Sequence, residues 1–178
     1  MKKRTTILLS CLAIALLSTA GLAETVVIDF DDHSGGMTPI PDGYAGFANW
    51  GSFAYSSTAQ PPAYVPLSGT TYALSVGAAQ PISFGEYYVF EGAWFIGYAP
   101  NAVAFELYAD GDLVHTSETL EVSFDYQWLA SGYDGLVNQV KIIYAFGANL
   151  WVMDDFTYQD NTVAAESTTW STLKSLYR

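Results

Sequence analysis

The chain is a succession of short segments rich in β-branched and aromatic residues, separated by turn-forming residues at fairly regular intervals. Such segments are typical of β-strands. No window between residues 24 and 158 keeps a helical apolar period for three turns, and no strand–helix–strand rhythm is present. The pattern predicts an all-β fold of antiparallel strands. The expected strands are 24–30, 70–76, 87–98, 102–109, 113–117, 120–128, 137–146 and 150–158.

Two features refine this prediction. Asp110-Gly111 lies between two apolar runs and indicates a tight hairpin, because a type I′ turn needs positive φ at both central residues. Residues 33–69 instead hold most of the prolines and many glycines. We expect this stretch to form long ordered loops with short strands, draped over one end of a sandwich, where binding groups often lie.

Residues 1–23 have the pattern of an export signal, with a basic start, an apolar stretch and small residues before a cleavage point after Ala23. The only cysteine, Cys11, would leave with this segment, so we expect neither disulfides nor thiol chemistry. The sandwich domain is then 24–158, and the protein is secreted, extracellular or on the cell surface, with the periplasm as the alternative. Residues 159–178 are a polar linker and a short amphipathic tail, either a frayed end or a sorting tag.

Loss of the leader leaves three basic residues against 18 acidic ones, a formal charge of −15. This balance excludes nucleic acid as a partner, and it equally disfavours anionic membrane surfaces. Two unit charges about 4 Å apart near a protein surface repel by roughly 1 to 4 kcal/mol. A bound cation would relieve that repulsion, and calcium is the commonest extracellular candidate.

Acidic residues gather at both ends of the domain, in "VVIDFDD" and "WVMDDFTY". If the terminal strands are neighbours, as in many jelly rolls, these carboxylates converge. Strict alternation along the last strand predicts one face with Met153, Asp155 and Thr157, and another with Val152, Asp154, Phe156 and Tyr158. Asp154 would then be the aspartate among the bulkier apolar neighbours, and the one that needs a partner.

The terminal segments "DFDD" and "MDDFTY" resemble the ends of secreted jelly-roll modules, among them galactose-binding-like carbohydrate-binding modules. Residues 43–53 and 105–114 are also similar to uncharacterised bacterial extracellular proteins with C-terminal sorting signals. The resemblance implies an antiparallel jelly-roll-like β-sandwich, galactose-binding-like or concanavalin-like. It also implies a structural calcium ion, completed by backbone carbonyls. The ligands it implies are Asp31 and Asp154 first, then Asp29, Asp155 and Asp32. The alternative is an aspartate pair that simply faces solvent at a strand end.

Exposed aromatic rings are the second candidate site, because sugar rings present apolar faces that stack on them. Trp50 in the glycine-rich loop is the first candidate for a sugar platform, followed by Tyr44 and Tyr55. Trp94 and Trp151 are expected in the core, where most aromatics of a sandwich lie.

Catalytic motifs are few. His33 adjoins the first aspartate cluster and is a candidate base or metal ligand, but no nucleophile elbow or zinc-binding helix is present. No pair of glutamates stands out as a glycosidase dyad. The sequence therefore predicts a non-catalytic binding module for a glycan, with calcium. The alternatives are a structural surface or matrix protein without a small ligand and, as a minority interpretation, a glycosidase. Nothing in the sequence indicates the oligomeric state.

Overall fold

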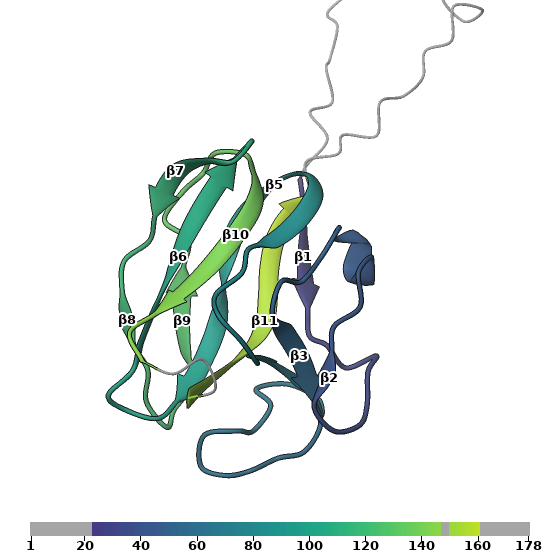
Figure 1. The fold of residues 1–178 in the computed structure, drawn as a ribbon, viewed down its shortest axis with the longest axis vertical. Helices are drawn as coiled ribbons and strands as arrows, with labels where there is room; N and C mark the ends of the chain where they lie inside the picture. The colour runs from purple at the N-terminus through teal and green to yellow at the C-terminus, as the bar shows by residue number, and fades with distance from the viewer. Residues whose placement is uncertain (1–22, 147–149, 161–178) are drawn as a thin grey trace, which may run out of the picture.

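The computed structural model describes residues 23–146 and 150–160, which form an antiparallel all-β fold compatible with the predicted β-sandwich (Figure 1). The prediction of an all-β chain is confirmed. A short helical turn, η1, spans Tyr44–Gly46. The strands are β1 (Glu24–Ile28), β2 (Thr38–Pro39), β3 (Phe53–Ser56), β4 (Tyr72–Ser75), β5 (Ile82–Gly97), β6 (Ala102–Ala109), β7 (Asp112–Thr116), β8 (Leu120–Glu121), β9 (Gln127–Ala130), β10 (Val137–Tyr144) and β11 (Trp151–Asp160).

The long strand β5 belongs to both layers. Its first part pairs with β10, with Ile82 opposite Val140. Its second part pairs with β11 on one side and β9 on the other. One layer therefore holds β2, β3, β4, β11, β5 and β9, with β1 beside β11, and the other holds β5, β10 and β6 with β7 and β8 along its edge.

Large aromatic side chains fill the space between the layers. Phe105 of β6 lies edge-on to Phe90 of β5, with ring centroids 4.8 Å apart, and also contacts Phe95. Burying a phenylalanine side chain contributes about 1.5 to 3 kcal/mol, so this cluster is the main source of stability. Its largest fully buried members are Trp50, Trp151, Phe30, Phe47, Phe84, Phe90, Phe95, Phe105 and Phe156.

The first strand lies beside the last, as predicted. β1 pairs with β11 antiparallel, from Glu24 opposite Asp160 to Ile28 opposite Phe156. β1 ends two residues earlier than expected and β11 continues two residues further, to Asp160. Residues 1–22 of the predicted export signal and residues 161–178 of the predicted tail lie outside the described residues. Across 23–146 and 150–160, no helix is long and apolar enough to span a membrane.

The Asp110-Gly111 hairpin is also confirmed, with φ of 54° and 88° at its two central residues. A second, smaller apolar cluster lies on the outer face of the β4–β11–β5 layer. It consists of Ala54, Tyr72, Leu74, Ile96 and Val152, and Tyr64, Val65 and Tyr126 pack against it. The loop that follows β3 therefore covers part of the outer face of β11, which decides where Asp154 lies.

Candidate functional site

Strand β11 contains a bulge at Asp155, which has φ of 49°. The pairing of β11 with β5 shifts register between Asp154 and Thr157. Because the bulge adds one residue to β11, the side chains that follow it point to the opposite face from the one that strict alternation predicts. The main core therefore receives Trp151, Met153, Phe156 and Tyr158, while Val152 joins the outer cluster. The predicted grouping of Asp154 with Phe156 and Tyr158 is wrong for this reason.

Asp154 is fully buried and accepts three backbone hydrogen bonds. Its Oδ2 accepts from the amides of Leu67 and Ser68, at 2.8 and 3.3 Å, and its Oδ1 accepts from the amide of Asp155 at 2.9 Å. Burial raises the pKa of the Asp154 carboxyl to about 7, although these three donors act in the opposite direction. Backbone amides of a loop therefore supply hydrogen bonds that this buried carboxylate needs.

Asp31 holds the other half of the same loop. Its Oδ1 accepts from the amides of Thr70 and Thr71, at 2.6 and 3.0 Å. Between the two sets of donors, Gly69 has φ of 50°, and a Cβ at this position would overlap the carboxylate of Asp31. We call Asp31, Asp154 and the backbone of residues 67–71 the carboxylate clasp. It joins the segment after β1 to the last strand through a loop that lies between them in sequence.

The remaining three aspartates surround the clasp. Asp155 accepts a hydrogen bond from the Ser68 hydroxyl at 3.1 Å. Burial raises the pKa of Asp155, and the charges of Asp29 and Asp31 raise it further, so these carboxylates lie near one another. Asp29 is exposed and accepts from the amide of Asp31. Asp32 is directed elsewhere, because it accepts from the Tyr44 hydroxyl at 2.8 Å.

The calcium ion implied by the resemblance fits this arrangement only in part. Asp154 does not fit, since its oxygens already accept three amides and it has no exposed surface. Asp31 and Asp155 are partly exposed, and each has one oxygen that accepts no hydrogen bond in the described structure. No group of three or more His, Cys, Asp or Glu side chains in the described residues is arranged to hold a metal. The five aspartates therefore do not form one ligand set, and calcium stays a prediction.

Trp50 is not a sugar platform. Its side chain is 1% exposed and packs against Phe47 and Phe156, with centroids 5.2 and 5.5 Å apart. Its indole N–H donates to the carbonyl of Tyr44 at 3.1 Å. The glycine-rich loop folds inward, because burying this large ring with its one donor satisfied stabilises more than leaving it in water.

Tyr44 and Tyr55 are half-buried on either side of His33. The His33 ring stacks on Tyr55, with centroids 4.2 Å apart and planes at 7°, and lies tilted against Tyr44 at 4.5 Å. Burial, followed by the hydrogen bond to Asp32, raises the pKa of the Tyr44 hydroxyl. Tyr44 also contacts Phe30 and Trp50, and one face of the Tyr55 ring is covered by His33. Sugar stacking on these two tyrosines stays a prediction.

Exposed aromatic rings lie instead on the outer face of β5 and β9. Trp94 and Trp128 are opposite each other in the β5–β9 pairing, with centroids 5.7 Å apart. Trp128 is 36% exposed, and Trp94 is half-buried. The prediction that Trp94 lies in the core is wrong, whereas Trp151 is fully buried as expected. Ala93 and Phe95 face the main core. Alternation along the strand therefore indicates the outer face for Trp94, which lies between them.

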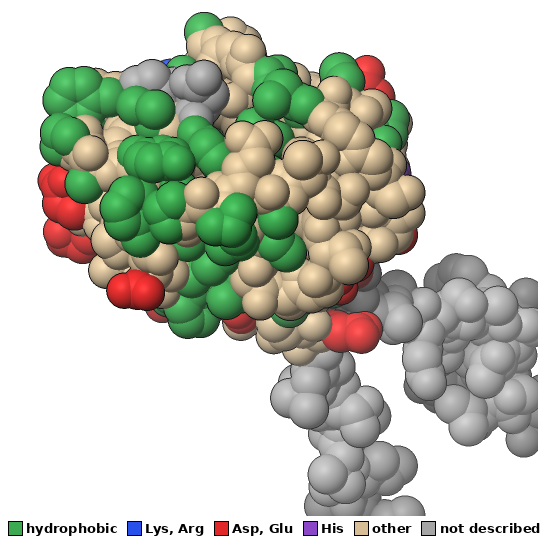
Figure 2. Space-filling view, turned by 90° about the horizontal axis from the view of Figure 1, so that it is seen from below, with side chains coloured by type: hydrophobic (Ala, Val, Ile, Leu, Met, Phe, Trp, Pro, Cys, Tyr) green, Lys and Arg blue, Asp and Glu red, His purple; other side chains and the backbone are tan. Residues whose placement is uncertain are grey.

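A second exposed group lies where β5 passes into β6. Tyr98 contacts both Phe124 and Tyr64, with centroids 5.3 and 5.5 Å apart, and Phe124 is 51% exposed. Figure 2 views the molecule from this end and shows hydrophobic side chains gathered on it.

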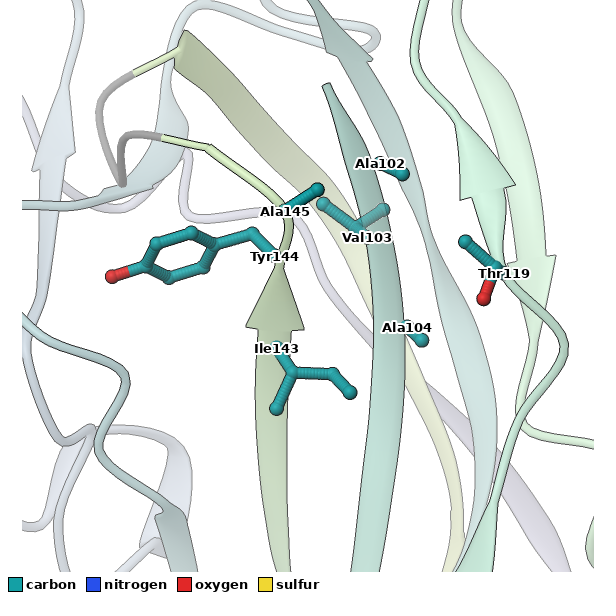
Figure 3. Close-up of a pocket in the computed structure, with 7 residues that line it drawn as sticks. All are labelled: Ala102, Val103, Ala104, Thr119, Ile143, Tyr144 and Ala145. Atoms are coloured by element: carbon teal, nitrogen blue, oxygen red, sulfur yellow. The ribbon is translucent and has the colours of Figure 1, made fainter. Parts of the chain in front are cut away.

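One shallow hollow, of about 250 Å³, lies over the ends of β6 and β10 (Figure 3). Tyr144 points away from β6 in this view, and its hydroxyl donates to the carbonyl of Gly77. The lining is therefore mostly small and apolar, with Thr119 as its one free hydroxyl side chain. It comprises Ala102, Val103, Ala104, Thr119, Ile143, Tyr144 and Ala145.

No protein-family model, curated protein or solved structure matches this chain. Its similarity to carbohydrate-binding modules therefore rests on the sequence motifs alone.

Proposed function

We propose that this protein is a secreted, non-catalytic module that binds carbohydrate. The observation that supports the proposal most is the partly exposed Trp128, held against Trp94 on the outer face of β5 and β9. A large, rigid aromatic surface loses little conformational freedom on binding, and its apolar face suits the C–H face of a pyranose ring. The proposal thus keeps the ligand class expected from the sequence and moves its platform away from Trp50.

We also propose a structural calcium ion beside the carboxylate clasp, with Asp31 and Asp155 as its side-chain ligands. The supporting observation is electrostatic. Burial raises the pKa of the Asp155 carboxyl, and the nearby charges of Asp29 and Asp31 raise it further. Within the described residues, the only lysine or arginine is Lys141, which pairs with Glu106 at 3.1 Å. Calcium takes oxygen ligands and would supply the positive charge that this cluster lacks.

A glycan array tests the proposed function. The protein, expressed with its own leader and purified, is applied to immobilised plant, fungal and bacterial polysaccharides in calcium and in chelator. We expect selective binding to at least one glycan class without release of reducing sugar. Absence of binding under both conditions contradicts the proposal, and release of reducing ends would make the protein a glycosidase.

A further inference from the structure

A groove lies along the open side of the sandwich, between edge strands of its two layers. One wall is the edge formed by β7, β8 and the segment between them, and within 23–146 and 150–160 these two strands pair with β6 alone. The other wall is β9, whose one partner among the same residues is β5. The groove has a volume of about 400 Å³. This volume is within the range of roughly 300 to 1,000 Å³ that is usual for small-molecule sites.

Two buried serines hold the walls in place. Ser117 accepts a hydrogen bond from the amide of Phe105 at 2.8 Å and donates to the carbonyl of Glu118 at 2.7 Å. On the opposite wall, the amide of Ser131 donates to the carbonyl of Glu91 at 2.7 Å. These bonds tie both walls to the central strands β6 and β5, so the groove is formed before any ligand arrives.

The lining combines an aromatic surface with hydrogen-bonding groups. Trp128 of β9, whose ring packs against Trp94, is one lining residue. The others include His115 and the exposed Thr116 and Thr119. The His115 ring stacks on Tyr133, with planes at 15°, and its Nε2 lies 3.4 Å from the position of a Cβ on Gly132. Glu118 is exposed at the same wall. An aromatic surface beside hydroxyl, imidazole and carboxylate groups matches the alternating apolar faces and hydroxyls of a sugar.

We infer that this groove binds a neutral oligosaccharide chain, with one sugar ring stacked on Trp128 and its hydroxyls bonded to Glu118, His115 and the threonines. The inference rests on the proposed function and adds its site and ligand class. We infer a neutral ligand because Glu118 is the one carboxylate of the lining and no lysine or arginine lines the groove. A uronic acid or sulfated sugar would meet uncompensated repulsion.

The adjoining surface indicates that the ligand is a chain of sugars and not a single sugar. Thr119 lines both this groove and the hollow over β6 and β10 in Figure 3. Thr119 therefore borders both depressions. A ligand that leaves the Trp128 groove past Thr119 enters a second depression lined by alanine methyl groups, where another sugar ring has an apolar surface to lie on.

Tryptophan fluorescence and titration calorimetry with defined hexasaccharides test the inference. The probes are the hexaoses of glucose, N-acetylglucosamine, xylose and mannose, with hexagalacturonate as the anionic comparison. We expect a neutral hexaose to bind more tightly than its monosaccharide, and hexagalacturonate not to bind. Trp128→Ala should weaken binding on the order of tenfold or more, the loss expected for a stacked aromatic anchor. Thr119→Val should weaken binding of the hexaose more than binding of the monosaccharide, because Thr119 also borders the second depression.

Phe124→Ala is the matched control, because it removes another exposed aromatic ring, at the end of the molecule, that does not line the groove. Thermal midpoints of all variants show that each is folded. Binding of a neutral hexaose that Trp128→Ala leaves intact, or that Phe124→Ala abolishes, overturns the groove while the proposed function stands. Tight binding of hexagalacturonate overturns the ligand class. Absence of binding to every glycan overturns both proposals.

Discussion

Asp31 and Asp154 are 123 positions apart in the chain and bind adjacent halves of one loop. Asp154 accepts the amides of Leu67 and Ser68, and Asp31 accepts those of Thr70 and Thr71. Hydrogen bonds from a backbone to a charged acceptor are stronger than those between neutral groups. Val65, just before this loop in the chain, packs against the outer apolar cluster, which includes Ile96 and Val152. The two carboxylates thereby couple the chain ends to the second apolar cluster.

Removal of either carboxylate should destabilise the fold. In Asp154→Ala, three amides lose their acceptor, and each unsatisfied buried donor costs about 1 to 3 kcal/mol. Urea unfolding should therefore show a loss of at least about 2 kcal/mol for Asp154→Ala and for Asp31→Ala. The double variant should lose less than the sum, because both hold one loop. Asp42→Ala, at an exposed aspartate, is the control, and equal stability of all four variants would show that the clasp is unimportant.

In calcium-free buffer, the free energy of unfolding should decrease as the pH is raised from about 4 to 7, because Asp154 ionises in this interval in the folded protein. Its pKa is about 7 in the folded protein against an ordinary 3.8, so in this interval the folded state binds more protons than the unfolded state. The free energy of unfolding then falls as pH rises and becomes level above pH 7. Asp155 acts in the same direction, and Glu106, whose pKa is lowered, acts in the opposite one.

Asp154→Asn isolates this effect, because its side chain does not titrate. The difference in unfolding free energy between the wild type and Asp154→Asn should shrink or change sign across the interval from pH 4 to 7. A difference that is constant with pH would mean that Asp154 titrates at its ordinary value.

Gly69→Ala should be strongly destabilising. The left-handed conformation costs a non-glycine residue about 1 to 2 kcal/mol, and the new methyl group would also overlap Asp31. We expect a total loss above about 2 kcal/mol in chemical denaturation. Gly36→Ala is the matched control, because a Cβ there has no atom within 4 Å. If both variants unfold at the same denaturant concentration, Gly69 is not required for the clasp.

Calcium should raise the thermal midpoint if it binds beside the clasp. Binding to the folded state alone adds about 2.7 kcal/mol at a hundredfold excess over the dissociation constant. Asp155→Asn should remove the calcium-dependent part of the midpoint, whereas Asp32→Asn, whose partner is Tyr44, should retain it. Superimposable melting curves in calcium and in chelator would exclude the ion.

Trp50→Ala and Trp128→Ala should have opposite consequences. Trp50 is buried among Phe47 and Phe156, so its truncation should cost about 3 to 5 kcal/mol of folding stability. Trp128 is partly exposed, and we expect a much smaller loss of stability together with the loss of glycan binding. A stable Trp50→Ala protein with impaired glycan binding would restore the platform expected from the sequence.

Local chemistry in the sequence determined most of the strands and the Asp110-Gly111 turn, whereas neighbouring chain ends were expected from the resemblance to jelly rolls. Period-two alternation and positive φ at glycine depend on a few adjacent residues, so they are predictable without the fold. The bulge at Asp155 also left a signal, because aspartate adopts the left-handed conformation more readily than apolar residues do.

Only the tertiary structure decided what the aspartates and aromatic rings face. Asp154 lies outside the main core because one extra residue shifts the register and a loop some 85 positions earlier covers it. Trp50 is buried because Phe47 and Phe156 close around it. The groove beside Trp128 exists because edges of two layers, distant in sequence, lie next to each other. Each of these depends on contacts between distant segments, and residue order alone does not encode such contacts as a local pattern.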